Sequence, residues 1–151
     1  MNDKENIELL KQAAQLEKDV SKLYMLYSEI FTKDKEFWRQ IAKEEAGHAA
    51  LIEMAMDYPD VFPQGLANSA LSQIKEISND IRKVIQEYNN KPPSKDQACN
   101  YALRVESSAW EFHYQKLATR IQDSDVIKIF QTLNDGDKDH IRRIAEFRDK
   151  K

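Results

Sequence analysis

Hydrophobic residues recur at alternating intervals of three and four over four long segments of the chain. This spacing places them along one face of an α-helix. It predicts helices over residues 4–32, 35–57, 95–121 and 125–148. Only short turns separate the first helix from the second and the third from the fourth. Each of these pairs is therefore expected to consist of antiparallel neighbours in a four-helix bundle.

A fifth amphipathic segment covers residues 68–88, between the second and third helices. Pro63 and Gly65 break the chain before it, and Pro92 and Pro93 end it. Its hydrophobic face carries neither an acid nor a histidine. A helix of about 21 residues spans ~32 Å, roughly the length of the whole bundle. We therefore expect a crossover helix that returns the chain to the opposite end of the bundle.

Three local signals refine the helix boundaries. Ser94 and Gln97 have the spacing of a capping box at the start of the third helix. Asp34 is the expected cap of the second helix. Gly136 is a poor helix former and directly precedes Asp137. It predicts an irregularity inside the last helix, of the kind that is frequent at functional sites.

Six ionisable side chains interrupt the hydrophobic faces of the four helices: Glu17, Glu45, His48, Glu106, Asp137 and His140. The two halves of the chain match, because in each half a single glutamate is followed by an acid-x-x-His motif on the next helix. An offset of about ninety residues relates the halves. The repeat predicts that four carboxylates and two imidazoles meet at one level of the bundle. Burying such groups is costly unless something compensates their charge.

A pair of metal ions would provide this compensation. Carboxylates and imidazoles suit iron or manganese, and carboxylates can bridge two ions held ~3.5–4 Å apart. Four carboxylates cancel the charge of two divalent ions, so the metal-free site is expected to be less stable. The alternative is a bundle whose buried polar groups bond only to one another. Glu44 and Asp139 flank the motifs outside the hydrophobic faces and are expected to be solvated.

Two further residues are candidates for contact with the ligands. Tyr24 follows Glu17 by seven positions, and His113 follows Glu106 by seven positions. Since seven residues make about two helical turns, we expect Tyr24 and His113 to lie close together on one side of the metals. They could orient a ligand or relay a proton or electron. The simpler alternative for both is an ordinary core residue with a satisfied polar end.

Composition narrows the class of protein. A chain of 151 residues with 41% hydrophobic and 32% charged residues, three glycines and four prolines favours a single soluble helical domain over residues 1–151. A net charge of -3 without a basic cluster argues against nucleic acids and membranes as partners. The first residues lack the apolar stretch of a signal peptide, so the cytoplasm is the expected location. A lone Cys99 excludes an internal disulfide.

The six-residue set resembles the di-iron site of the ferritin-like superfamily, specifically its small rubrerythrin-like branch. Glu17 followed seven positions later by Tyr24 resembles the first-helix signature of that branch. The resemblance covers essentially the whole chain. It implies an all-α, ferritin-like four-helix bundle with an additional helix in the long crossover between helices 2 and 3, and a non-haem di-iron centre. Asp137 stands where the family usually has glutamate, and Ala109 where rubrerythrins carry a further glutamate.

The resemblance implies an oxidoreductase that reduces peroxide or oxygen with electrons from an external donor. Its cofactors would be two iron ions, with manganese or a mixed pair as the alternative. Glu17 and Glu106 would be terminal ligands, Glu45 and Asp137 would bridge or partly bridge, and the two histidines of the motifs would supply nitrogen. A ferroxidase or iron-storage subunit is the second hypothesis, and a metal-free scaffold or partner-binding module is the third. A homodimer is better supported than a closed cage.

Overall fold

All the regular secondary structure in the described part of the chain is helical. The structure, a computed structural model, describes residues 2–58, 66–108 and 124–150, and no strand occurs in these ranges. The helices there are α1 (Asn2–Ile30), the 3-10 helix η1 (Thr32–Asp34), α2 (Lys35–Ala55), α3 (Leu66–Asn90), α4 (Lys95–Glu106) and α6 (Ser124–Asp149). The all-α prediction is confirmed for these residues. None of their helices is both long and apolar enough to cross a membrane.

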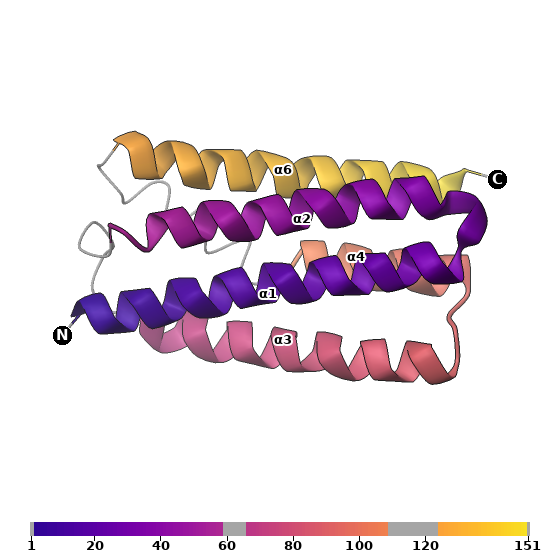
Figure 1. Cartoon of the computed structure of the whole chain (residues 1–151), viewed down its shortest axis with the longest axis horizontal. Coiled ribbons are helices and arrows are strands. Elements are labelled where there is room, and N and C mark those ends of the chain that lie inside the picture. Colours follow the sequence, from indigo (N-terminus) through magenta and orange to yellow (C-terminus); the bar gives the residue numbers. More distant parts are fainter. Residues whose placement is uncertain (1, 59–65, 109–123, 151) are drawn as a thin grey trace.

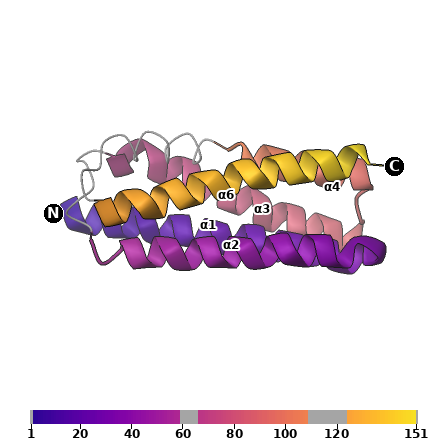
Figure 2. The same ribbon diagram turned by 90° about the horizontal axis from the view of Figure 1, so that it is seen from above.

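The helices lie roughly parallel to one long axis (Figure 1). Helix α1 packs against α2 and α3, and α6 packs against α2 and α4. The chain turns back at η1, so α1 and α2 are antiparallel. Helix α3 then lies along α1 and runs in the same direction, which returns the chain to the end of the molecule where η1 joins α1 to α2. Helix α4 begins at that end. Figure 2 shows the same arrangement from above, with α6 beside α2. Helix α3 thus has the direction expected of a crossover helix.

An aromatic cluster joins α1, α2 and α6 near the η1 end of the bundle. The ring of Trp38 lies 4.8 Å from that of Tyr27 and 5.5 Å from that of Tyr24, and all three side chains are fully buried. Phe37 and Phe147 stack at 4.1 Å beside them. Aromatic residues at such separations add both buried area and favourable ring contacts. The cluster therefore fixes the spacing of these helices one or two turns from the buried ionisable residues.

Helix α4 ends earlier than the periodicity predicts. The sequence predicts a continuous helix to residue 121, whereas the structure ends α4 at Glu106. The backbone N–H of Ser108 donates to the carbonyl of Val105 at 3.1 Å, which is a tightened final turn. Two consecutive serines, Ser107 and Ser108, favour such a turn because their hydroxyls compete for nearby backbone groups. The rest of the predicted helix, residues 109–121, lies outside the described residues.

The three local signals have different outcomes. The capping box is confirmed, since Ser94 Oγ accepts from the Gln97 N–H at 3.1 Å and Gln97 Oε1 accepts from the Ser94 N–H at 3.0 Å. Asp34 holds the cap position of α2, but its side chain makes no capping bond. Its φ of -113° and ψ of 21° belong to η1 rather than to the extended geometry that capping requires. The predicted irregularity at Gly136 is wrong, because α6 is a regular helix there.

Candidate metal centre

The structure brings all six residues of the internal repeat into one buried region. They are Glu17 on α1, Glu45 and His48 on α2, Glu106 at the end of α4, and Asp137 and His140 on α6. None has more than 8% of its surface exposed. Helical periodicity explains this placement, because each residue occupies the hydrophobic face that its helix turns toward the core. The role of these residues as metal ligands remains a prediction.

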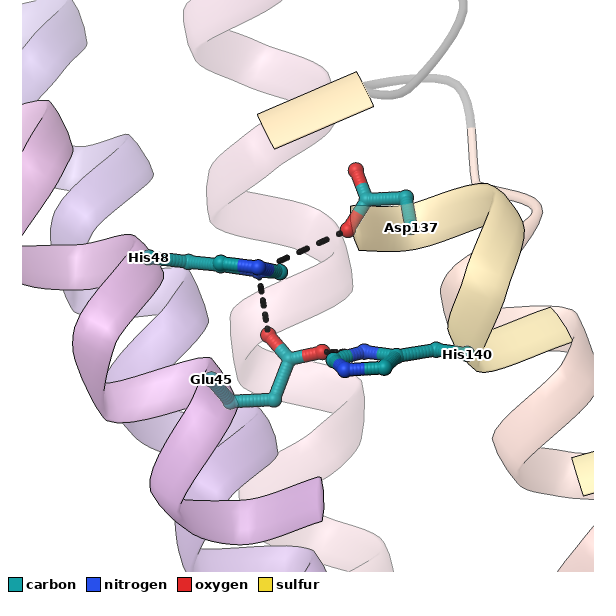
Figure 3. A group of neighbouring side chains, drawn as sticks. All are labelled: Glu45, His48, Asp137 and His140. Carbon is teal, nitrogen blue, oxygen red and sulfur yellow. Dashed lines mark hydrogen bonds and ion pairs between the residues drawn. The ribbon is translucent and has the colours of Figure 1, made fainter. Parts of the chain in front are cut away.

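Glu45 lies between the two imidazoles (Figure 3). Its Oε1 atom is 2.7 Å from Nδ1 of His140, and its Oε2 atom is 3.6 Å from Nδ1 of His48. The Nδ1 atom of His48 is also 3.7 Å from Oδ1 of Asp137, and that of His140 is 3.4 Å from Oε1 of Glu106. Both histidines therefore turn the same nitrogen, Nδ1, toward the carboxylates.

The four carboxylates share a small cavity. Burial, and after it the nearby Glu45, raise the pKa of Glu17, so α1 and α2 bring two carboxyl groups together at this level. Glu17, Glu45, Glu106 and Asp137 all line a cavity of about 20 Å³, together with apolar side chains of α1 and α4. Its walls combine four acidic groups with hydrophobic surface. The geometry suits a small charged or polar occupant.

Tyr24 contacts this group directly. Its side chain is fully buried, and its hydroxyl donates to Oε1 of Glu106 at 2.8 Å. Burial and the neighbouring Glu106 carboxylate raise the pKa of Tyr24, so the phenol keeps its proton and remains a donor. The structure thus places Tyr24 against a predicted ligand. His113, which the sequence predicts to lie beside Tyr24, is outside the described residues.

Protons compensate part of the negative charge in the metal-free protein. Burial, followed by repulsion from neighbouring carboxylates, raises the pKa values of Glu17, Glu45 and Asp137 well above the ordinary range. These three groups therefore hold protons to a higher pH than exposed carboxyl groups do. Metal ions that bind here would displace those protons.

Glu106 and His140 form the ionised pair. Burial opposes charge on both groups, but their 3.4 Å approach, together with Glu44 beside His140, outweighs it. The pKa of Glu106 therefore falls, and that of His140 rises to about 9. His140 lies closer to Glu45, yet Glu106 carries the negative charge because Glu45 retains its proton. Burial and the charge on His140 lower the pKa of His48 to about 4. His48 is therefore neutral at pH 7, with a nitrogen lone pair free for a metal.

The buried carboxylates and imidazoles are arranged so that they could bind a cation. Two buried atoms, Oε2 of Glu45 and Nδ1 of His48, have no hydrogen-bond partner in the described part of the chain, and such atoms are costly to bury. Ligand atoms of Glu45, His48, Asp137 and His140 all lie within 4.8 Å of one another. Atoms on opposite sides of one ion are roughly 4–5 Å apart, because metal–ligand bonds are ~2.0–2.6 Å long. These four residues could hold a metal ion.

Comparisons of the chain with protein-family models, curated proteins and solved structures found no match. The interpretation of the centre therefore rests on its own residues and geometry. The donor set consists of carboxylates and imidazoles without a thiolate, which argues against an iron–sulfur cluster and suits a divalent metal ion such as iron, manganese or zinc.

The expectation that Glu44 is solvated is wrong. It is half-buried, and its Oε1 atom lies 3.2 Å from Nε2 of His140 and accepts a hydrogen bond from Nη1 of Arg143 at 2.7 Å. Its Oε2 atom accepts from Nε2 of Gln40 at 3.0 Å. The reason is the position of α6, which packs against the side of α2 on which Glu44 lies. Asp139 is also half-buried and pairs with Arg143 at 3.1 Å.

Gly136 has a role that its helix propensity does not reveal. A Cβ atom added at Gly136 would lie 2.5 Å from Nε2 of His48. Real Cβ atoms are essentially never found so close to another atom, so the missing side chain is what lets the His48 ring fit against α6. In the sequence, the sign of this role is that Gly136 directly precedes the predicted ligand Asp137. The periodicity of a single helix could not show which residue the glycine faces.

Proposed function

We propose that this protein is a ferritin-like, rubrerythrin-like oxidoreductase that binds two iron ions and reduces peroxide or oxygen with electrons from an external donor. Manganese or a mixed pair is the alternative metal content. The proposed bundle consists of α1, α2, α4 and α6, with α3 as the crossover helix. The observation that carries the proposal is the meeting of four carboxylates and two imidazoles in one buried region.

The orientation of the side chains supports a division into two metal positions. His140, Glu106 and Glu45 would hold one ion, and His48, Asp137 and Glu45 would hold the other. The two oxygens of Glu45 face different imidazoles, which suits a bridging ligand. The nitrogen ligand at each position would be Nδ1, since this atom faces the carboxylates in both rings.

The cavity between the four carboxylates suits a small oxidant. When bound, two ferrous ions supply the two electrons that, with two protons, convert hydrogen peroxide into two molecules of water. The carboxylate-lined cavity of about 20 Å³ has room for a molecule of roughly the size of water. Pockets for organic ligands are usually ~300–1,000 Å³. The cavity between the four carboxylates is much smaller than such a pocket, which agrees with a small oxidant.

Tyr24 would orient a ligand in this scheme. Its hydroxyl fixes Oε1 of Glu106, the atom that also faces His140. A donor that holds one ligand in place is typical of metal sites, where such contacts affect metal affinity. Aromatic and apolar residues around Tyr24 exclude bulk water from that side of the centre.

The test is anaerobic loading of metal-free protein with ferrous iron, followed by rapid mixing with hydrogen peroxide or oxygen. Absorbance follows oxidation of the iron, and a chemical reductant then restores the ferrous state for another cycle. We expect peroxide or oxygen to oxidise the loaded protein through repeated cycles. A His48→Ala/His140→Ala variant should show only the rate of free iron. Equal rates in both proteins would overturn the proposal, and retention of excess ferric iron would establish iron handling instead.

A further inference from the structure

The internal repeat has a reciprocal feature outside the six ligands. Glu44 directly precedes Glu45, and Gly136 directly precedes Asp137, so the two residues are equivalent in the repeat. Each lies against Nε2 of the histidine from the other half. Glu44 Oε1 is 3.2 Å from Nε2 of His140. At Gly136, an added Cβ would be 2.5 Å from Nε2 of His48. Equivalent positions thus offer a carboxylate to one imidazole and only a backbone to the other.

Glu44 is held firmly in its position. Arg143 donates to the same oxygen that faces His140, at 2.7 Å, and Gln40 donates to the other oxygen at 3.0 Å. The fixed carboxylate accepts a hydrogen bond from the Nε2–H of His140. This leaves the Nδ1 lone pair of His140 for a metal once the proton on that atom has left. Carboxylates placed in this way fix the tautomer of a ligand histidine and make it more basic.

Within the described ranges, no carboxylate supports His48 in a comparable way. Its Nδ1 atom lies 3.6 Å from Glu45 and 3.7 Å from Asp137, which is too far for a hydrogen bond. Its Nε2 atom faces the backbone at Gly136 instead of a carboxylate. Since α6 is a regular helix at Gly136, the glycine is not required by the backbone conformation. Its effect is the space it leaves beside the His48 ring.

We propose that Glu44 and Gly136 make the two metal positions unequal. The position on the His140 side binds its ion first and more tightly, and the position on the His48 side binds later and exchanges its ion more readily. This inference rests on the proposed function, because it requires two ions to bind. Glu44 and Arg143 are positioning residues here, since they act through His140 and touch no metal themselves.

The inference is tested by titrating metal-free protein with cobalt(II), followed by calorimetry and visible absorption. Wild type is expected to bind in two steps of different affinity. Glu44→Ala should weaken the tighter step by about 10–100-fold and leave the weaker step nearly unchanged. Glu44→Gln should restore part of the loss, because its amide oxygen can accept the same hydrogen bond. Asp139→Ala is the matched control, since Asp139 also pairs with Arg143 but its substitution should leave both steps unchanged.

Single histidine variants assign each step to a position. His48→Ala should keep the tighter step and lose the weaker one, and His140→Ala should lose the tighter step. Three results would each overturn this inference and leave the two-ion centre intact. They are identical affinities in wild type, equal weakening of both steps by Glu44→Ala, and loss of the tighter step in His48→Ala. No cobalt binding by folded wild type would overturn the proposed function and this inference together.

Discussion

Nδ1 of His140 lies 2.7 Å from Oε1 of Glu45, although 95 residues separate the two in the sequence. The contact joins α6 to α2 inside a buried region and links the two halves of the internal repeat. The other oxygen of Glu45 faces the second imidazole, that of His48, at 3.6 Å. A single carboxylate therefore connects both histidines, and any change in its charge affects both proposed metal positions.

The stability of the metal-free protein should fall as the pH rises from 6.5 to 9. The pKa of His140 rises from 6.5 to about 9 on folding, so its stabilising charge is fully present below pH 6.5 and is lost as the pH passes through 9. The pKa values of Glu17, Glu45 and Asp137 are also raised on folding, so the loss of their protons likewise lowers the stability of the folded protein as the pH rises. His48 does not contribute to this pH dependence above pH 6.5. Its pKa is about 4 in the folded protein, so its imidazole is neutral in both the folded and the unfolded state there.

Urea denaturation in the presence of a chelator measures this dependence. We expect the free energy of unfolding to decrease steadily across the window in wild type, and less steeply in a folded His140→Gln variant. Addition of manganese(II) should stabilise the protein more at the upper end of the window, because metal and protons compete for the same groups. A stability that stays constant or rises between pH 6.5 and 9 would contradict this account of the charges.

Tyr24 and Tyr27 form a matched pair for testing the contact with Glu106. The Tyr24 hydroxyl donates to Glu106 at 2.8 Å, whereas the equally buried Tyr27 hydroxyl has no hydrogen-bond partner in the described part of the chain. Tyr24→Phe should destabilise the metal-free protein by about 1–3 kcal/mol, because it leaves a buried carboxylate short of a donor. Tyr27→Phe should cost nothing. Similar losses in both variants, measured by urea denaturation, would show that the contact is unimportant.

The two glycines of α2 and α6 form a second pair. Gly47 is exposed and has nothing within 4 Å of an added Cβ, so Gly47→Ala should stabilise the protein by up to about 1 kcal/mol through helix propensity. Gly136→Ala should lose this gain, because the added methyl group displaces the ring of His48. Thermal unfolding and cobalt titration of both variants test this. Equal stabilisation with unchanged metal binding would remove the role assigned to Gly136.

Much of the helical arrangement follows from local sequence pattern. The predicted ends of α1, α2, α3 and α6 agree with the structure to within two residues, because a 3.6-residue period is a property of each segment alone. The meeting of the six ionisable residues follows from the same logic. Glu17 and Glu45 lie at similar distances from the η1 turn, and residues at equal heights on antiparallel helices become neighbours.

The remaining features depend on distances between helices. The contact of Glu44 with His140 and the approach of Gly136 to His48 are set by how closely α2 and α6 pack, and periodicity within one helix contains no such information. The end of α4 is followed by Ser107 and Ser108, a residue type that favours a turn because its hydroxyl can compete for backbone groups.

The most direct test of the account is the metal content of the protein. Elemental analysis of wild type purified without chelator is predicted to find about two iron or manganese ions per chain. A Glu45→Ala/His140→Ala variant, checked for helical content, should lose them. A folded wild type that contains no metal, and binds none after anaerobic addition of ferrous iron, would contradict the account and leave a helical scaffold with buried polar contacts.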